Sequence, residues 1–208
     1  MLLMLYSELN LINEIHFVNI GRLDEDFLSW KSPRTDKIFT RLDALGLRTF
    51  PGNMDYYRHM KDPRHETKTV IKQFGTDSGS ETVFIVVAAS TCQYQVIEAF
   101  IEYLSSKWFS IYDTSMIRSG GAGGEMFGSF HRIIEEALSE VPTRDLKRVQ
   151  AYCKPTNEVI DVWVKKSLVS QASSLPAALV FEHGPYHILL YLDGQFKVRE
   201  QKMVDYSG

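Results

Sequence analysis

The stretch TVFIVVAAS, residues 82 to 90, decides the fold because it is apolar along almost its whole length. A strand with one solvated face alternates apolar and polar residues, whereas a strand buried on both faces is a continuous apolar run. The turn-forming residues Asp77-Ser78-Gly79-Ser80 come shortly before it. We therefore predict a strand over 82–89 at the centre of a sheet whose two faces are both covered.

A long amphipathic helix is predicted directly after this strand. Ser90 or Thr91 is suited to cap it, because a hydroxyl oxygen there can accept a hydrogen bond from the first turn. The apolar residues that follow recur at spacings of three and four, as helical packing requires: Val96, Ala99, Phe100, Tyr103, Leu104, Trp108 and Ile111. A second helix is predicted over 126–141, and Pro142 is expected to end it.

The N-terminal side of the chain predicts two opening strands and a helix. Residues 2–6 are apolar, and residues 12–20 alternate in part, so we expect two strands joined by a short turn. Gly21 is expected to break the second strand. Ser32-Pro33 is a typical helix start, and Gly46 is placed to end that helix.

The segment over 47–66 is punctuated by proline, glycine and clustered aromatic and histidine residues. It is too interrupted for a regular element and long for a plain connection, so we expect an insertion or a partner-contacting loop. Residues 67–74 are then predicted to form a strand that turns back into the central strand over 82–89.

The rest of the chain is predicted to be rich in β structure. Alternation and turn residues indicate strands over 149–153, 158–164, 179–182, 186–192 and 196–199. The order of elements predicts an α+β protein with a mixed or antiparallel sheet packed with helices. We predict one α+β domain over 1–142 and a β-rich C-terminal extension over 143–208, which packs on the first sheet or forms its own.

Composition narrows the classes of function. The net charge is −3 over 208 residues and the basic residues are scattered, which argues against a nucleic-acid or anionic-membrane partner. No apolar run reaches the roughly 20 residues that a membrane span needs, so membrane contact is expected to be indirect. Cys92 and Cys153 are too few for a metal cluster and indicate reduced thiols in the cytosol.

The glycine run Gly120-Gly121-Ala122-Gly123-Gly124 is the most prominent candidate for a phosphate-binding loop. A predicted helix, and not a strand, precedes it, and no Lys-Ser or Lys-Thr pair follows. Glu125 stands where the anion would dock and would repel it. We interpret the run as a link that reverses the chain between two helices.

Histidines supply two further candidate sites. His183, His187 and Glu182 flank a Gly-Pro turn and carry atoms that can bind a metal or transfer protons, although a pair of surface histidines explains them equally. The segment 47–66 and its border hold a second polar cluster that fits a metal site or an ordinary solvated loop: His59, His65, Asp55, Asp62 and Glu66.

A cysteine nucleophile and an aromatic interface complete the candidates. Cys92 lies near the start of the predicted helix, where the helix dipole would lower its pKa, and His131 is the histidine within a predicted helix. A buried thiol and a surface imidazole are the simpler interpretation. The aromatic side chains that core packing or a protein interface could use are Tyr56, Tyr57, Trp108, Phe109 and Tyr112.

The order of elements resembles the longin domain of membrane-fusion proteins, clathrin-adaptor small and medium chains and the signal-recognition-particle receptor alpha subunit. The resemblance rests on MLLMLYSELNLINEIHFVNI, TVFIVVAAS, TCQYQVIEAFIEYLSSKWFSIY and EMFGSFHRIIEEALSEV, which lie within residues 1–142. The long segment 47–66 and the β-rich tail depart from it. The resemblance carries no catalytic residues, metal or cofactor to this sequence.

The resemblance implies a non-enzymatic adaptor or scaffold of the membrane-trafficking or small-GTPase-regulating type. Its partner would be another protein, either a small GTPase or a second longin-like subunit, bound on a sheet edge or a helix face. Two alternatives stay open. One is a small metal-dependent or histidine-based hydrolase that uses His183, His187 and Glu182, and the other is a ligand-sensing domain of the profilin-like or PAS-like kind.

Overall fold

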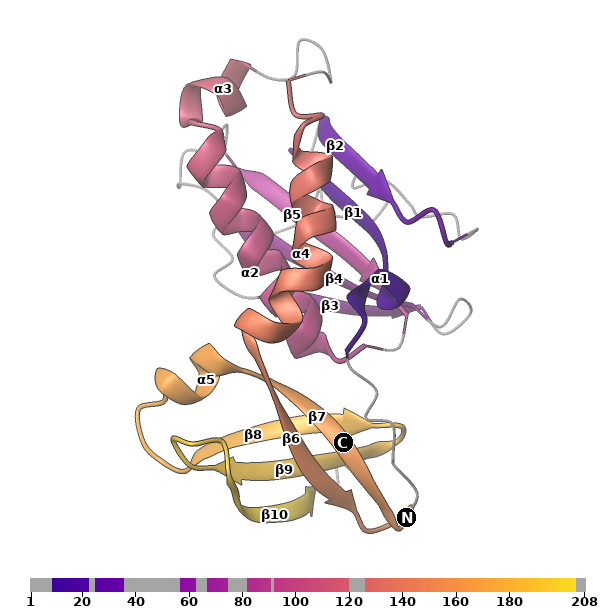
Figure 1. Cartoon of the computed structure of the whole chain (residues 1–208), viewed down its shortest axis with the longest axis vertical. Coiled ribbons are helices and arrows are strands. Elements are labelled where there is room, and N and C mark those ends of the chain that lie inside the picture. Colours follow the sequence, from indigo (N-terminus) through magenta and orange to yellow (C-terminus); the bar gives the residue numbers. More distant parts are fainter. Residues whose placement is uncertain are drawn as a thin grey trace. The chain divides into compact units, whose positions relative to one another are not determined.

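The computed structural model describes residues 9–22, 25–35, 57–62, 67–74, 82–90, 92–119 and 126–204 (Figure 1). The chain divides into two units, Met1–Pro142 and Thr143–Gly208. None of the described helices is long and apolar enough to cross a membrane.

Unit 1 is built on a five-stranded sheet with the order β2-β1-β5-β4-β3. Its strands are β1 (Ile15–Gly21), β2 (Asp26–Lys31), β3 (Arg58–Asp62), β4 (Thr67–Phe74) and β5 (Val83–Ala89). Every neighbouring pair is antiparallel. All seven residues of β5 are buried and the strand lies at the centre of the sheet, which confirms the prediction made from its apolar run.

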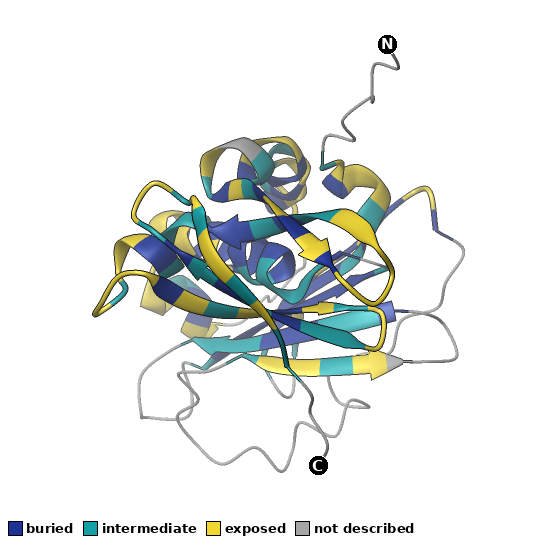
Figure 2. Ribbon diagram, turned by 90° about the horizontal axis from the view of Figure 1, so that it is seen from below, coloured by how far each residue is buried: buried dark blue, intermediate teal, exposed yellow. Residues whose placement is uncertain are grey.

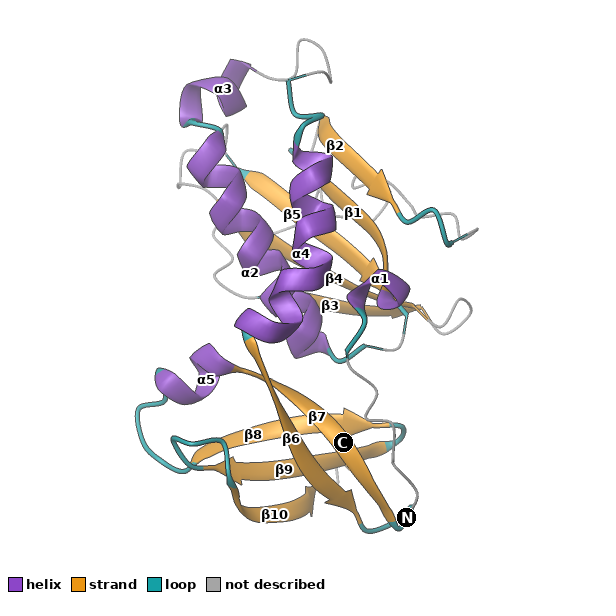
Figure 3. Cartoon of the chain, in the orientation of Figure 1, coloured by secondary structure: helices purple, strands orange, loops and turns teal. Residues whose placement is uncertain are grey.

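Two long helices, α2 (Tyr94–Ile111) and α4 (Phe130–Arg144), lie across one face of this sheet (Figure 3). The short α1 (Leu11–Glu14) precedes β1, and α3 (Thr114–Ser119) follows α2. Trp108 of α2 is fully buried, and the rings of Phe27, Tyr112, Phe127 and Phe130 surround it at centroid distances of 4.6 to 6.2 Å. This aromatic cluster joins β2, α2 and α4.

Several predicted boundaries in unit 1 are wrong. Residues 12–14 belong to α1 and not to a strand, and the opening hairpin pairs β1 with β2. The strand predicted over 2–6 lies outside the described residues. Ser32 to Thr35 form a turn closed by a hydrogen bond of 3.2 Å from Thr35 N to Ser32 O, so the predicted helix does not begin there, and its remainder lies outside the described residues.

The predicted ends of the two long helices also need correction. The N-cap of α2 is Gln93, and the Ser90 hydroxyl donates instead to Glu14 Oε2 at 2.9 Å. Pro142 lies inside α4, which continues to Arg144. Pro142 has no N–H to donate to the carbonyl four residues earlier, so α4 lacks one main-chain hydrogen bond in its last turn.

Part of the segment over 47–66 is a strand. β3 is polar, with the sequence RHMKD, and its pairing with β4 defines it, from Arg58 opposite Ile71 to Asp62 opposite Thr67. A short polar edge strand has no alternating apolar face, which is why the sequence pattern indicated a loop.

Unit 2 consists of β6 (Leu146–Cys153), β7 (Glu158–Lys165), α5 (Lys166–Ser170), β8 (Ala177–His183), β9 (Tyr186–Leu192) and β10 (Val198–Val204). β6 and β7 form a two-stranded sheet, and β8, β9 and β10 form a three-stranded one. These are the predicted strands, with β10 displaced toward the C-terminus and α5 added. The α+β class and the β-rich C-terminal region are therefore confirmed.

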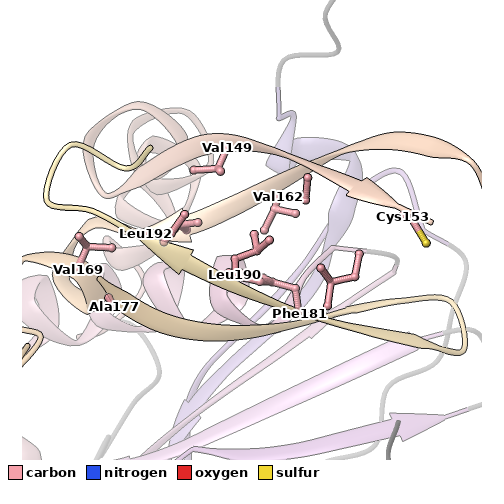
Figure 4. Packing of buried hydrophobic residues seen from close by; sticks show 11 residues of the cluster. Val149, Cys153, Val162, Val169, Ala177, Phe181, Leu190 and Leu192 are labelled. Atoms are coloured by element: carbon pink, nitrogen blue, oxygen red, sulfur yellow. The ribbon is translucent and has the colours of Figure 1, made fainter. Parts of the chain in front are cut away.

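The two sheets of unit 2 share one core (Figure 4). Buried residues alternate with exposed or half-buried ones along much of β6 and β9 (Figure 2), so each sheet turns one apolar face inward. Gln201 of β10 also joins the sheets, because its side-chain amide accepts from Tyr152 N at 3.0 Å and donates to Tyr152 O at 2.7 Å. The amide thus acts as a neighbouring peptide group at the edge of β6.

Candidate functional site

The outer edge of β2 is a candidate binding surface of unit 1. Ser32 N donates to His16 O at 2.9 Å, and the register pairs Trp30 with Val18 and Leu28 with Ile20. In an antiparallel ladder, residues two apart point their main-chain groups the same way. Ser29 and Lys31 therefore point their N–H and C=O groups away from β1.

No strand pairs with β2 on that outer side in the part of the chain that the structure describes (Figure 1). The side chains of Ser29 and Lys31 are both exposed. An edge with unbonded main-chain groups can bind another extended strand, which would complete its hydrogen bonds. We call the segment from Asp26 to Lys31 the β2 edge.

A buried asparagine fixes the position of the β2 edge. Asn19 of β1 is 1 % exposed, and its Nδ2 donates to Ser29 Oγ at 2.7 Å, to Asp26 Oδ1 at 3.2 Å and to Leu28 O at 3.3 Å. Its Oδ1 is buried and accepts no hydrogen bond from the described residues. Asn19 is hydrogen-bonded at this buried position and ties β1 to three residues of β2.

A bulge shapes the start of the β2 edge. The register shifts between Ile20 and Gly21, so that Gly21 pairs with Asp26 while Ile20 pairs with Leu28. Phe27 is the extra residue, and its ring packs against Trp108 and Phe127 at centroid distances of 6.2 and 5.1 Å. The bulge therefore turns Phe27 toward the helices and leaves Asp26 exposed.

The other edge of the sheet, formed by β3, carries a polar cluster between β3 and α2. His59 Nε2 lies 2.8 Å from Glu98 Oε1, and the imidazole stacks on Tyr94 at 4.3 Å. The Lys68 ammonium lies 4.6 Å from the centroid of the Tyr94 ring. Predicted site residue His59 thus belongs to a contact that holds β3 on α2.

Tyr57 extends this cluster by one further contact. Its hydroxyl donates to Glu102 Oε1 at 2.8 Å, and Lys72 lies 5.1 Å from its ring centroid. Burial, together with the Glu102 carboxylate, holds the pKa of the Tyr57 phenol well above its usual range. The other members of the predicted cluster, His65, Asp55 and Glu66, lie outside the described residues, and of Asp62 only the strand position in β3 is described.

The candidate histidine site of the C-terminal region is not assembled. Glu182 pairs with His187 and His183 pairs with Tyr186 across the β8–β9 hairpin, so the two histidines lie on opposite faces of the sheet. His183 Nε2 lies 3.7 Å from Glu158 Oε2, and His187 Nε2 lies 3.9 Å from Glu182 Oε1. Across the described residues, no three histidine, cysteine or acidic side chains converge as a metal site would require.

Cys92 and His131 do not form a nucleophile pair, and their interpretation as a buried thiol and a surface imidazole is confirmed. Cys92 is buried and precedes the helix, and burial followed by the Glu14 carboxylate raises the pKa of its thiol to about 12. The helix dipole was expected to lower this pKa, so that expectation is wrong. His131 is exposed on α4.

The remaining candidates divide between core and surface. Trp108 and Tyr112 are core residues, whereas Phe109 is 42 % exposed and its ring lies 5.9 Å from that of Phe74. Tyr56 and the run Gly120 to Gly124, with Glu125, lie outside the described residues. A helix, α3, does precede the glycine run, as predicted.

Sequence reasoning missed β2, and with it the whole β2 edge. The signal was present in DFLSWK, because Leu28 and Trp30 alternate with Ser29 and Lys31. Comparison of the chain with protein-family models, with curated proteins and with solved structures gives no match.

Proposed function

We propose that this protein is a non-enzymatic protein-interaction module that binds an extended strand of a partner chain on the β2 edge. The observation that carries the proposal is the pair of outward-pointing residues Ser29 and Lys31, which offer main-chain donors and acceptors to a partner strand. Strand addition of this kind derives its affinity from main-chain hydrogen bonds and its specificity from the alternating side chains.

The surroundings of the β2 edge support this role. Asn19 and the packed ring of Phe27 hold the strand in one position before any partner arrives. An edge that is already ordered loses less conformational entropy on binding than a mobile one. Leu28 and Trp30 are buried, so a partner strand would extend an existing apolar layer.

The longin-like interpretation of unit 1 belongs to the same proposal. An opening hairpin, three further strands and then long helices follow one another along unit 1, and the resemblance depends on an element order of this kind. The hairpin lies at residues 15–31, later than the sequence suggested. Under this interpretation the protein is an adaptor in membrane trafficking or small-GTPase regulation, with a GTPase or a second longin-like subunit as partner.

A single proline substitution in the β2 edge tests the proposal. Lys31→Pro removes the outward N–H of the β2 edge but leaves the hydrogen bonds to β1, since those belong to Trp30 and Ser32. Lys31→Ala is the matched control, because it removes the same side chain and keeps the N–H. The tagged wild-type protein and both variants are used to recover partners from native lysate, and the recovered proteins are then purified and titrated.

We expect a partner that binds the wild type and Lys31→Ala and fails to bind Lys31→Pro. Circular dichroism spectra of the three proteins must agree, so that a folding defect is not read as a binding defect. A partner that binds Lys31→Pro as tightly as Lys31→Ala would place the interaction elsewhere and refute the proposal. Recovery of no other protein across a range of salt concentrations, together with no self-association of the purified chain, would also count against it.

A further inference from the structure

The β2 edge is complementary to itself. Asp26 and Ser29 both bond to Asn19 Nδ2, so their side chains lie on the same face of the sheet, and Lys31, two residues after Ser29, shares that face. Leu28 and Trp30 lie on the other face, with the apolar layer under the helices. One face of the strand is therefore polar with both signs of charge, and the other is apolar.

We propose that two copies of this chain associate by antiparallel pairing of β2 with β2 about Ser29, which joins the five strands of each copy into one continuous sheet. This inference names the partner of the proposed β2 edge and rests on that proposed function. A two-fold axis through an antiparallel pair places equal residues opposite each other at its centre, so the contact closes after two copies.

The side chains favour the pairing that is centred on Ser29. Leu28 then lies opposite Trp30 of the second copy, and the apolar layer continues across the junction. Lys31 lies opposite the bulge of the second copy, where Phe27 turns toward the helices and Asp26 takes the polar face. Each Lys31 ammonium thereby meets an Asp26 carboxylate, and the symmetry makes this contact twice.

Other registers lose these contacts. A pairing centred on Lys31 places the two ammonium groups opposite each other, and like charges directly across a ladder are destabilising. A pairing centred on Trp30 places Lys31 opposite Ser29 and moves Asp26 beyond the paired segment. Only outward-pointing residues can form the new hydrogen-bonded pairs, so the choice is confined to these positions along Ser29 to Lys31.

The central position gives a direct chemical test. In a hydrogen-bonded antiparallel pair the two Cα atoms are about 5.5 Å apart, within the range that a disulfide bridges. Ser29→Cys is therefore expected to form a covalent dimer on mild oxidation of the full chain. Ser174→Cys, at an exposed serine of unit 2, is the matched control and is expected to stay monomeric on a non-reducing gel. The native Cys92 and Cys153 are buried and do not compete.

Charge exchange gives a second test that does not depend on the cysteine variant. We expect sedimentation velocity of the purified wild type to show a concentration-dependent dimer. Lys31→Asp and Asp26→Lys should each weaken dimerisation about tenfold, because each turns two attractive pairs into two repulsive ones. The double variant should recover most of the loss, and the recovery should shrink as salt is raised.

The outcomes separate this inference from the proposed function. A dimer that is cross-linked through Ser29→Cys and restored by the charge exchange supports it. A chain that stays monomeric at every accessible concentration overturns it. A dimer that is neither cross-linked in Ser29→Cys nor weakened by Lys31→Asp or Asp26→Lys overturns it as well. A monomer that still binds a different protein in a Lys31→Pro-sensitive way would overturn the self-association and leave the β2 edge as an interaction site.

Discussion

Gly21→Ala is predicted to destabilise unit 1 because the β1–β2 turn has no room for a methyl group. A Cβ added at Gly21 would lie 2.4 Å from Glu25 O and 3.1 Å from Asp26 Cα, both main-chain atoms. Normal carbon–oxygen contact requires a separation almost an ångström larger, so the main chain of Glu25 must move. That carbonyl also accepts from Arg22 N at 2.8 Å, and moving it weakens the hydrogen bond that closes the turn.

The expected cost follows from these two effects. Overpacking against main chain costs about 1–3 kcal/mol, and a weakened main-chain hydrogen bond adds up to about 1 kcal/mol. Alanine recovers roughly 0.5–1 kcal/mol, since glycine is the more flexible residue in the unfolded chain. The net loss is about 2 kcal/mol, which lowers Tm by about 4–8 °C for a domain of this size.

The assay is scanning calorimetry together with hydrogen–deuterium exchange. Unit 1 should melt earlier in Gly21→Ala, and peptides that cover β1 and β2 should exchange faster than those of unit 2. Gly194→Ala is the control, because a Cβ there would meet only Cδ1 of the exposed Leu175 side chain, at 3.3 Å. If Gly21→Ala is as stable as Gly194→Ala, the close approach in the β1–β2 turn is wrong and the bulge that shapes the β2 edge is wrong with it.

Three further predictions concern the two cores and the thiols. Trp108→Ala should cost about 3–5 kcal/mol by emptying the aromatic cluster. Trp108→Phe should cost less, because it keeps a ring in the cluster and the buried indole N–H has no acceptor among the described residues. Urea titrations followed by circular dichroism compare the two. Gln201→Leu should cost about 1–2 kcal/mol and speed exchange of the Tyr152 amide, while an unchanged exchange rate would contradict the amide clamp. Cys92 should resist iodoacetamide at pH 8 until the protein is unfolded, since its folded pKa of about 12 keeps the thiol protonated. Because that pKa exceeds the unfolded value of 9.0, the free energy of unfolding should fall as pH rises from about 9 to 12. The fall should be less steep in Cys92→Ser.

The elements that bury many apolar residues could be predicted from the sequence. β5 is apolar throughout and is central, and α2 repeats its apolar residues at helical spacing and is buried along that face. The strands of unit 2 were predicted for the same reason, with β9 matching at both ends. In each case the spacing of apolar residues within the segment indicates which of its faces is buried.

The edge strands could not be predicted in the same way. β3 is polar and exists through its ladder with β4, and β2 is short and bulged, so its alternation covers only Leu28 to Lys31. Edge strands bury less apolar surface than central ones and leave a weaker sequence pattern. The proposed β2 edge was missed for this reason.

The amino-acid sequence by itself determined the α+β class, the buried central strand, the long helix over it and the β-rich tail, because hydrophobic periodicity is a local property of each segment. Only the tertiary structure decided which side chains meet. It bonds Asn19 to Ser29 and Asp26, separates His183 from His187, and encloses Cys92 beside Glu14. These relations depend on strand register and on contacts between residues far apart in the chain, and a shift of one residue in a ladder exchanges the two faces of a strand.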